Sequence, residues 1–201
     1  MERGRLRIIA CASGEVLASR MVAELEKLEG RASSREELLI ASQEVTFPNG
    51  EVKTTLGDSV RGDDVYVVQS VQDPLSARTI NDNLMALVTA LNAAHQGDAD
   101  HITAVLPQFP YARQERKKER EAITAQQVAR LIEHAGANRV LTLDIHAQAI
   151  SGFFDRATMD DLHASGPISE HVRKHYPTDN LMIVSPDVGS ADRAIVARLD
   201  E

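Results

Sequence analysis

The stretch Arg139–Ala147 reads RVLTLDIHA and carries the pattern on which the fold prediction rests. A short apolar run ends in polar Asp144 and His146, as expected of a buried strand whose carboxyl end reaches solvent. Apolar stretches with helical spacing lie between this run and the similar runs that precede it. Those runs are Ile8–Cys11, Asp64–Gln69 and His101–Leu106. Strands that alternate with helices predict an α/β fold, with a parallel sheet and helices on both faces.

Capping residues and glycines suggest where two of these helices begin and end. Asn81 is expected to cap a helix that stops before Gly97, because asparagine side chains accept hydrogen bonds from helix N–H groups. Thr124 and Gln127 have the spacing of a capping box, and Gly136 follows the helix that they would open.

The carboxyl-terminal part of the chain has a weaker pattern. Residues 155–180 show no clear strand, so we expect a passage between domains there. One strand at residues 180–185 and one helix from about Ala191 follow, which is too little for a second core. The prediction is an N-terminal domain at residues 1–160 and only the start of a second domain at residues 161–201.

Composition narrows the class of protein. The chain has 201 residues, a formal net charge of −8 and a single cysteine, Cys11. The acidic balance argues against a general nucleic-acid binder. Apolar runs stay far below the roughly 18 residues of a membrane helix, and the N-terminus lacks a signal-peptide pattern. A lone cysteine forms no internal disulfide, so a cytoplasmic setting is expected.

Residues 113–120 form a basic segment in this acidic chain. They contain five basic and two acidic side chains. Two interpretations stay open: the segment binds a small polyanion, or it is a solvated loop with local ion pairs.

Polar groups at the carboxyl ends of strands are candidates for a site, because ligands of open α/β sheets bind there. Asp144 and His146 follow one strand, Asp187 follows another, and Gln108–Gln114 follow a third. Carboxylates suit Mg²⁺. Alternatively, Asp144 and Asp187 cap helices or turns, and His146 is a partly buried core residue.

The segment Phe47–Glu51 has the composition of a turn, set by Pro48 and Gly50. Phe47 could belong to the core or stack on a base, and the residues alone favour the core. No Gly-x-x-x-x-Gly-Lys-Ser/Thr loop is present, which excludes a Walker-type ATP site.

Eight stretches together resemble the ribose-phosphate diphosphokinase family, also called phosphoribosyl-pyrophosphate synthetases. Each stretch alone is weakly specific, but all eight occur in the family's order. They are Phe47–Glu51, Val60–Val65, Asn81–Met85, Tyr111–Gln114, Ala135–Ala137, Asp144–Ala147, Ile150–Asp155 and Val184–Gly189.

The resemblance implies a phosphoribosyltransferase-like domain, duplicated in the complete enzyme, and homo-oligomers in which dimers assemble into hexamers. The implied substrates are ATP, bound with Mg²⁺ between subunits, and ribose 5-phosphate. The implied reaction transfers diphosphate from Mg-ATP to the 1-hydroxyl of the sugar, for nucleotide biosynthesis.

The resemblance also implies roles for single residues. Phe47, Asn49 and Glu51 match the loop that holds adenine across the dimer interface, and Arg113 and Gln114 match nucleotide-binding residues. His146 and Asp187 match the Mg²⁺ and substrate centre, where Arg113 would also serve catalysis. Ser59 and Arg61 match a regulatory phosphate or ADP site.

Several positions depart from the family pattern. Residues 71–80 are longer than the family's equivalent, one extra residue follows Phe154, and other changes fall in loops around the implied site. These are Glu115, Ala122, Ser151, Ala157 and Ser190. They leave an alternative open, in which the protein is a non-catalytic homologue that binds and regulates an active synthetase.

The family's catalytic Lys/Arg loop and its ribose-phosphate loop would follow residue 201. We therefore expect the 201-residue chain alone to have no synthetase activity. Formation of phosphoribosyl pyrophosphate by the purified chain would refute this expectation.

Overall fold

The computed structural model describes residues 4–28, 34–74, 76–177, 181–182 and 184. The chain divides into two compact units, Met1–Asp161 and Leu162–Glu201. The first unit contains the sheet and most of the predicted site. That the second unit opens another phosphoribosyltransferase-like domain stays a prediction.

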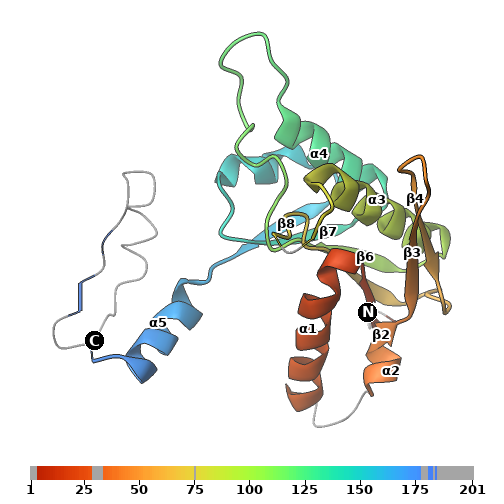
Figure 1. Ribbon diagram of the computed structural model, residues 1–201, viewed down its shortest axis with the longest axis horizontal. Coiled ribbons are helices and arrows are strands. Elements are labelled where there is room, and N and C mark those ends of the chain that lie inside the picture. The colour runs from red at the N-terminus through yellow and green to blue at the C-terminus, as the bar shows by residue number, and fades with distance from the viewer. Residues whose placement is uncertain (1–3, 29–33, 75, 178–180, 183, 185–201) are drawn as a thin grey trace. The chain divides into compact units, whose positions relative to one another are not determined.

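A six-stranded sheet forms the centre of the first unit, in the order β2-β1-β5-β6-β7-β8 (Figure 1). Its strands are β1 Leu6–Ala10, β2 Leu39–Ile40, β5 Asp64–Val68, β6 His101–Val105, β7 Arg139–Leu143 and β8 Thr158–Leu162. The pairs β1/β2, β1/β5, β5/β6 and β6/β7 are all parallel. The predicted parallel sheet is confirmed, and four of its strands agree with the apolar runs to within two residues at each end.

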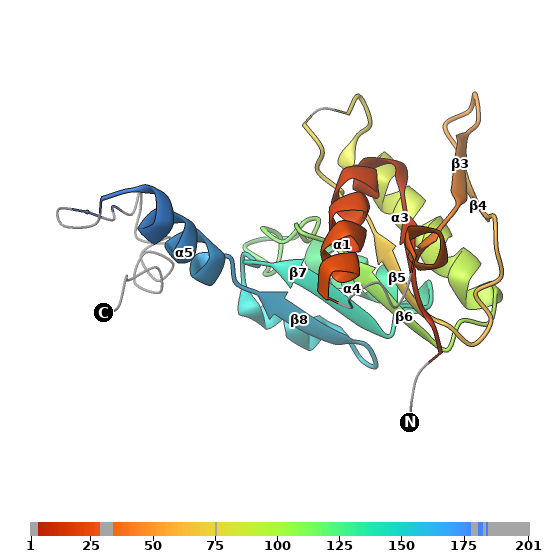
Figure 2. The same ribbon diagram turned by 90° about the horizontal axis from the view of Figure 1, so that it is seen from below.

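Helices cover both faces of this sheet, as predicted. They are α1 Glu15–Leu28 and α2 Arg35–Leu38 on one face, and α3 Ile80–Gln96 and α4 Thr124–His134 on the other. Adjacent residues of β1 show the division: Ile8 packs in a cluster with Val22 of α1, whereas Ile9 packs with Leu87 of α3. Successive strand side chains point to opposite faces, so an apolar strand needs cover on both. Figure 2 looks onto the face that α1 covers.

The start of α3 differs from the prediction. Thr79, not Asn81, is the cap: its hydroxyl accepts from the Asp82 N–H at 3.2 Å, and the Asp82 carboxylate accepts from the Thr79 N–H at 2.8 Å. This reciprocal capping box satisfies two N–H groups, which a cap at Asn81 would leave to solvent. Gly97 ends the helix as predicted.

The start of α4 is also different. Its N-cap residue is Ile123, and no side chain caps the helix, so the predicted capping box of Thr124 and Gln127 is wrong. The backbone takes over this role, because the Ala125 N–H donates to the Gln114 carbonyl at 3.3 Å. Gly136 follows the helix as predicted, with φ +118°.

A two-stranded antiparallel hairpin leaves the main sheet after β2. It consists of β3 Ser42–Thr46 and β4 Val52–Leu56, and Thr46 pairs with Val52 next to its tip. The sequence indicated only the turn. Phe47 lies at the tip with 42% of its surface exposed, so the core interpretation of this residue is wrong.

The segment 155–180 is more regular than predicted. It contains β8 and, in the second unit, α5 Ser165–His175. Two carboxylates hid the strand: Asp160 pairs with Arg139 at 3.4 Å, and Asp161 accepts from the Ile145 N–H at 2.9 Å. The strand expected at residues 180–185 falls partly outside the described residues, and the helix from Ala191 falls wholly outside them. None of the described helices has the length and apolar composition needed to cross a membrane.

Gly136 provides a test of this packing. A Cβ at this position would lie 2.6 Å from the His95 Cβ, on backbone at φ +118°. We expect Gly136→Ala to lower the free energy of unfolding by about 1–3 kcal/mol, measured by urea denaturation. Gly152→Ala is the control, since nothing lies within 4 Å of its added Cβ. Equal stability of the two variants would contradict the packing.

Candidate functional site

The loops that follow β6 and β7 leave the sheet at the same side, because the two strands are parallel. We call this side, where the strands have their carboxyl ends, the carboxyl edge. The Leu106 N–H donates to the Leu141 carbonyl at 2.8 Å, and the Leu143 N–H donates to the Pro107 carbonyl at 3.3 Å. The first loop carries Arg113 and Gln114, and the second carries His146. The structure thus brings both predicted loops to one edge.

An aromatic contact joins the two loops beneath this edge. Phe109 from the first loop and Phe154 from the chain after the second meet edge to face, with ring centroids 6.3 Å apart and planes at 80°. Both rings are buried and share the core with Ile145 and Ile150. Such pairs contribute about 0.5–1.5 kcal/mol to stability beyond the burial of their surface. The two loops are therefore packed together beneath the carboxyl edge.

Hydrogen bonds fix both ends of the segment Tyr111–Gln114 within the first loop. The Tyr111 hydroxyl donates to Asn81 Oδ1 in the first turn of α3. The Gln114 N–H donates to the Tyr111 carbonyl at 2.9 Å, while the Gln114 carbonyl accepts from Ala125 in α4. Tyr111 has φ +59°, a conformation that costs free energy for a non-glycine residue. Arg113 and Gln114 are therefore held, exposed, between two helix starts.

The second loop presents Asp144 and His146 at the end of β7. His146 is exposed, which rules out the core alternative for it. The short 3₁₀ helix Gln148–Phe153 has Ala147 at its cap position and no side-chain cap, so Asp144 does not cap it. Asp144 is partly buried at φ +48°, an uncommon conformation that aspartate tolerates better than most residues.

A buried carboxylate supports the chain just beyond this loop. Glu133 of α4 is 4% exposed, and its Oε1 accepts from the N–H groups of Arg156 and Ala157, both at 2.6 Å. Burial is the largest single influence and acts to raise the pKa of Glu133. Hydrogen bonds from the backbone of Ala157, Arg156 and Asp155 outweigh it and lower that pKa. The ionised carboxylate thus holds the turn that follows Phe154.

The hairpin tip places Phe47, Asn49 and Glu51 together. The Phe47 N–H donates to the Glu51 carbonyl at 2.8 Å, and the Glu51 N–H donates to Asn49 Oδ1 at 3.2 Å. All three residues are exposed. The hairpin follows β2 at one end of the strand order, whereas β7 and β8 lie at the other (Figure 2). Within one chain, the tip is therefore separate from Arg113 and His146.

Ser59 and Arg61 occupy the opposite edge of the sheet, in the loop that precedes β5. The Arg61 N–H donates to Ser59 Oγ at 3.4 Å, and Arg61 Nη1 donates to Asp98 Oδ2 at 2.6 Å. Both predicted regulatory residues are exposed and adjacent, away from the carboxyl edge.

Metal-binding capacity at the carboxyl edge is limited among the described residues. No group of three or more His, Cys, Asp or Glu side chains in this part of the chain could hold a metal ion. Asp187 lies outside the described residues. A Mg²⁺ ion that takes most of its ligands from water and phosphate needs few ligands from the protein. His146 is the predicted metal-contacting residue that lies within the described part of the chain.

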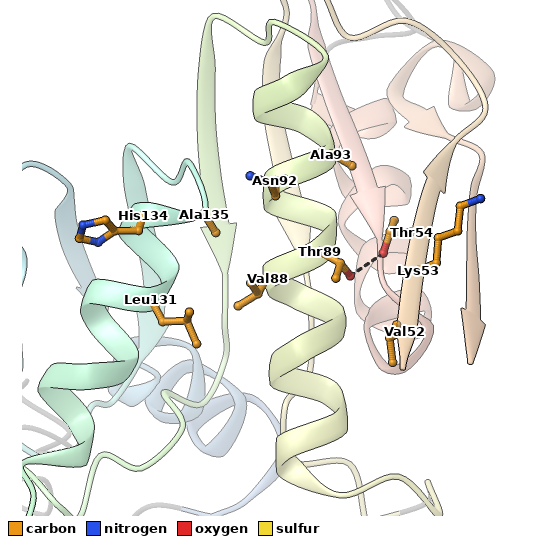
Figure 3. A pocket seen from close by; sticks show the side chains of 10 residues that line it. All are labelled: Val52, Lys53, Thr54, Val88, Thr89, Asn92, Ala93, Leu131, His134 and Ala135. Atoms are coloured by element: carbon orange, nitrogen blue, oxygen red, sulfur yellow. Dashed lines mark hydrogen bonds between the residues drawn. The ribbon is translucent and has the colours of Figure 1, made fainter. Parts of the chain in front are cut away.

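A groove of about 580 Å³ lies elsewhere, between β4, α3 and the end of α4 (Figure 3). Lys53, Asn92 and His134 stand at its walls among apolar side chains, and a 2.9 Å hydrogen bond joins Thr54 to Thr89 on one side. None of the predicted site residues lines this groove.

Comparison with known proteins identifies the family of this chain. A model of the N-terminal domain of ribose phosphate pyrophosphokinase matches residues 6–136. The chain belongs to the ribose-phosphate pyrophosphokinase family. The resemblance found in the sequence is thereby confirmed.

Relatives of known name extend this match. The chain is 48% identical over 157 residues to ribose-phosphate pyrophosphokinase of Maricaulis maris, covering 78% of this chain and 49% of that protein. It is 42% identical over 198 residues to that of Granulibacter bethesdensis, covering 97% and 59%. The crystal structure of phosphoribosylpyrophosphate synthetase from Mycobacterium smegmatis superposes with a TM-score of 0.82 at 34% identity, covering 96% and 60%. The chain thus spans between half and three-fifths of these relatives.

Sequence reasoning missed polar groups that support this family's fold at the same edge. Gln69 Nε2 donates to the Asn83 carbonyl at 3.0 Å, and Ser13 Oγ donates to Asn83 Oδ1 at 3.2 Å. Gln69 and Asn83 are fully buried. The available signal was a glutamine that directly ends an apolar strand. Glu133 gave no signal, because glutamates on helices are usually exposed.

Glu133→Gln tests the buried support. The neutral amide is a weaker acceptor for two backbone N–H groups, so we expect it to lower the free energy of unfolding at pH 7 by about 1–3 kcal/mol. A glutamate whose pKa is lowered by folding stabilises the folded state at pH values above its pKa in the unfolded chain, which is about 4.3. This contribution to stability is lost as the pH falls through the pKa of the folded state. Unfolding titrations from pH 7 to pH 3 should show a smaller loss of stability in the variant than in the wild type. Parallel curves would contradict the role given to Glu133.

Proposed function

We propose that the full-length protein is a ribose-phosphate diphosphokinase. The 1-hydroxyl oxygen of ribose 5-phosphate bonds to the β-phosphorus of ATP and loses its proton. The bond between that phosphorus and the oxygen bridging to the α-phosphorus breaks, and AMP leaves with the bridging oxygen. The products are phosphoribosyl pyrophosphate and AMP.

Family membership, together with the junction of the β6 and β7 loops, carries this proposal. Phosphoryl transfer requires aligned reactants and neutralised charge more than covalent help from the protein. Arg113 would supply a fixed positive charge and a planar fork for phosphate oxygens, and Gln114 would add hydrogen bonds to the nucleotide. The segment Tyr111–Gln114 is held at both of its ends before any ligand arrives, which favours alignment.

Magnesium enters the proposal with ATP. We assign His146 and Asp187 to the contact with Mg-ATP, the first as an imidazole at the end of β7 and the second as a carboxylate. Bound Mg²⁺ supplies charge neutralisation on phosphate oxygens. His146 is exposed at the edge that Arg113 shares, which suits this assignment.

The hairpin supports a homo-oligomer. Phe47, Asn49 and Glu51 are exposed at a tip that its own chain does not bring to Arg113. We propose that a second copy receives the tip, so that the adenine lies between subunits. Dimers formed in this way would assemble further, to hexamers.

Two further assignments complete the proposal. Ser59 and Arg61 would bind a phosphate or ADP effector, at an edge distinct from that of the reaction. The reaction is placed in the cytoplasm, where the free thiol of buried Cys11 would stay reduced.

The decisive assay uses the full-length gene product. Mg-ATP and ribose 5-phosphate should yield AMP and phosphoribosyl pyrophosphate in equal amounts. Absence of product from a folded full-length protein would overturn the proposal. Calorimetric titration with Mg-ATP then identifies the alternative, because a non-catalytic homologue would bind the nucleotide weakly or not at all.

Phe47→Ala tests the hairpin assignment. Loss of a stacked ring should weaken ATP binding by the full-length protein about threefold to tenfold, measured as Kd. The unfolding free energy should change little, since Phe47 is exposed. Phe47→Tyr keeps the ring and should bind ATP as the wild type does. Unchanged affinity in Phe47→Ala would show that Phe47 does not contact the base.

A further inference from the structure

The hairpin β3–β4 has an inner face, and two of its residues there make polar contacts to the rest of the first unit. Glu44 on β3 pairs directly with Thr54 on β4, and residues paired in this way point to the same face. Thr54 bonds to Thr89 of α3 at 2.9 Å. The partners of Glu44 come from two loops at the carboxyl edge of the sheet.

Glu44 is held by both of its oxygens. Oε2 accepts from the Ala12 N–H, two residues after the end of β1, at 3.2 Å. Oε1 accepts from the guanidinium of Arg78. Arg78 belongs to the segment between β5 and α3, whose length departs from the family pattern. One carboxylate thus connects the hairpin to the loops that follow β1 and β5.

Burial makes this ion pair different from the exposed pair of Lys27 and Glu24. The side chains of Arg78 and Glu44 are 23% and 11% exposed, whereas those of Lys27 and Glu24 on α1 are 68% and 67% exposed. Exposed pairs contribute little, because water and ions screen them. Removal of one partner from a mostly buried pair leaves the other charge without compensation, which is strongly unfavourable.

We propose that Arg78 is a positioning residue, which holds the hairpin against the carboxyl edge through Glu44 and thereby fixes where the tip Phe47–Glu51 is presented. The consequence for nucleotide binding rests on the proposed function; the mechanical contact does not. Without Arg78, the Glu44 carboxylate lowers its free energy by turning toward water, and the hairpin moves with it. The contact at Thr54 and Thr89 then acts as a pivot.

Hydrogen exchange on the 201-residue chain tests the contact without any assay of activity. Arg78→Met keeps the length of the side chain and removes its charge and donors. Amide exchange within Ser42–Thr46 and Val52–Leu56 should accelerate about tenfold, while exchange within β5 and β6 stays as in the wild type. Lys27→Met removes an exposed pair of the same type and should leave the hairpin unchanged.

Glu44→Gln provides the second arm. Its single amide oxygen can still accept from Arg78 but not from Ala12 at the same time, so exchange in the hairpin should rise, and by less than in Arg78→Met. The double variant should exchange no faster than Arg78→Met alone, because both changes remove one interaction. Wild-type exchange in the hairpin of Arg78→Met, or additive effects of the two substitutions, would overturn the proposal. If Arg78→Met does not fold, Glu44→Gln decides: acceleration confined to the hairpin supports the proposal, and wild-type exchange overturns it.

The effect on the proposed site is read in the full-length protein. Arg78→Met should raise KM for ATP about threefold to tenfold, with kcat and KM for ribose 5-phosphate close to wild type. A fall in kcat, or an equal rise in KM for ATP and for ribose 5-phosphate, would indicate general damage to the protein and would overturn the positioning role. If the wild-type protein itself is inactive, the proposed function fails, and the exchange experiment still decides the role of Arg78.

Discussion

The parallel register of β6 and β7 is the constraint on which the candidate site depends. Thr103 pairs with Arg139 and Val105 with Leu141, so both strands end at one edge and their loops start side by side. The contact between the Phe109 and Phe154 rings then packs these two loops against each other. A shift of register by one residue would turn the buried faces of β7 toward solvent and separate the loops. The position of Arg113 relative to His146 therefore depends first on the pairing of β6 with β7, and only then on the conformation of the loops.

Charged groups that are buried or partly buried complete this arrangement at two places. The Glu133 carboxylate satisfies backbone N–H groups in the turn after Phe154, and the Glu44 carboxylate joins the hairpin to the loops at the carboxyl edge. Each carboxylate must keep its donors, because an uncompensated charge away from water is costly. One contact holds the turn after Phe154, and the other holds the segment between β5 and α3 that carries Arg78.

The sequence predicted the parallel sheet well, because strands covered on both faces are mostly apolar, as in Val65–Val68 of β5. It failed where strands are short and partly polar. Ser42–Thr46 and Val52–Leu56 have only one covered face, and Thr158–Leu162 contains two aspartates whose partners lie far away in the chain. The candidate site residues were predicted from the family resemblance and the strand ends. Their support was not, since the roles of Tyr111, Gln69 and Glu133 depend on contacts between segments that no local pattern reveals.

The position of the bound nucleotide distinguishes the proposed site from the other surfaces of the protein. A crystal structure of the full-length protein with Mg²⁺ and a non-hydrolysable ATP analogue tests this most directly. The phosphates should lie at the carboxyl edge, beside Arg113 and His146, with the base against the hairpin tip of a neighbouring subunit. A nucleotide seated instead in the groove between β4, α3 and α4, or at the edge that carries Ser59 and Arg61 alone, would contradict the account.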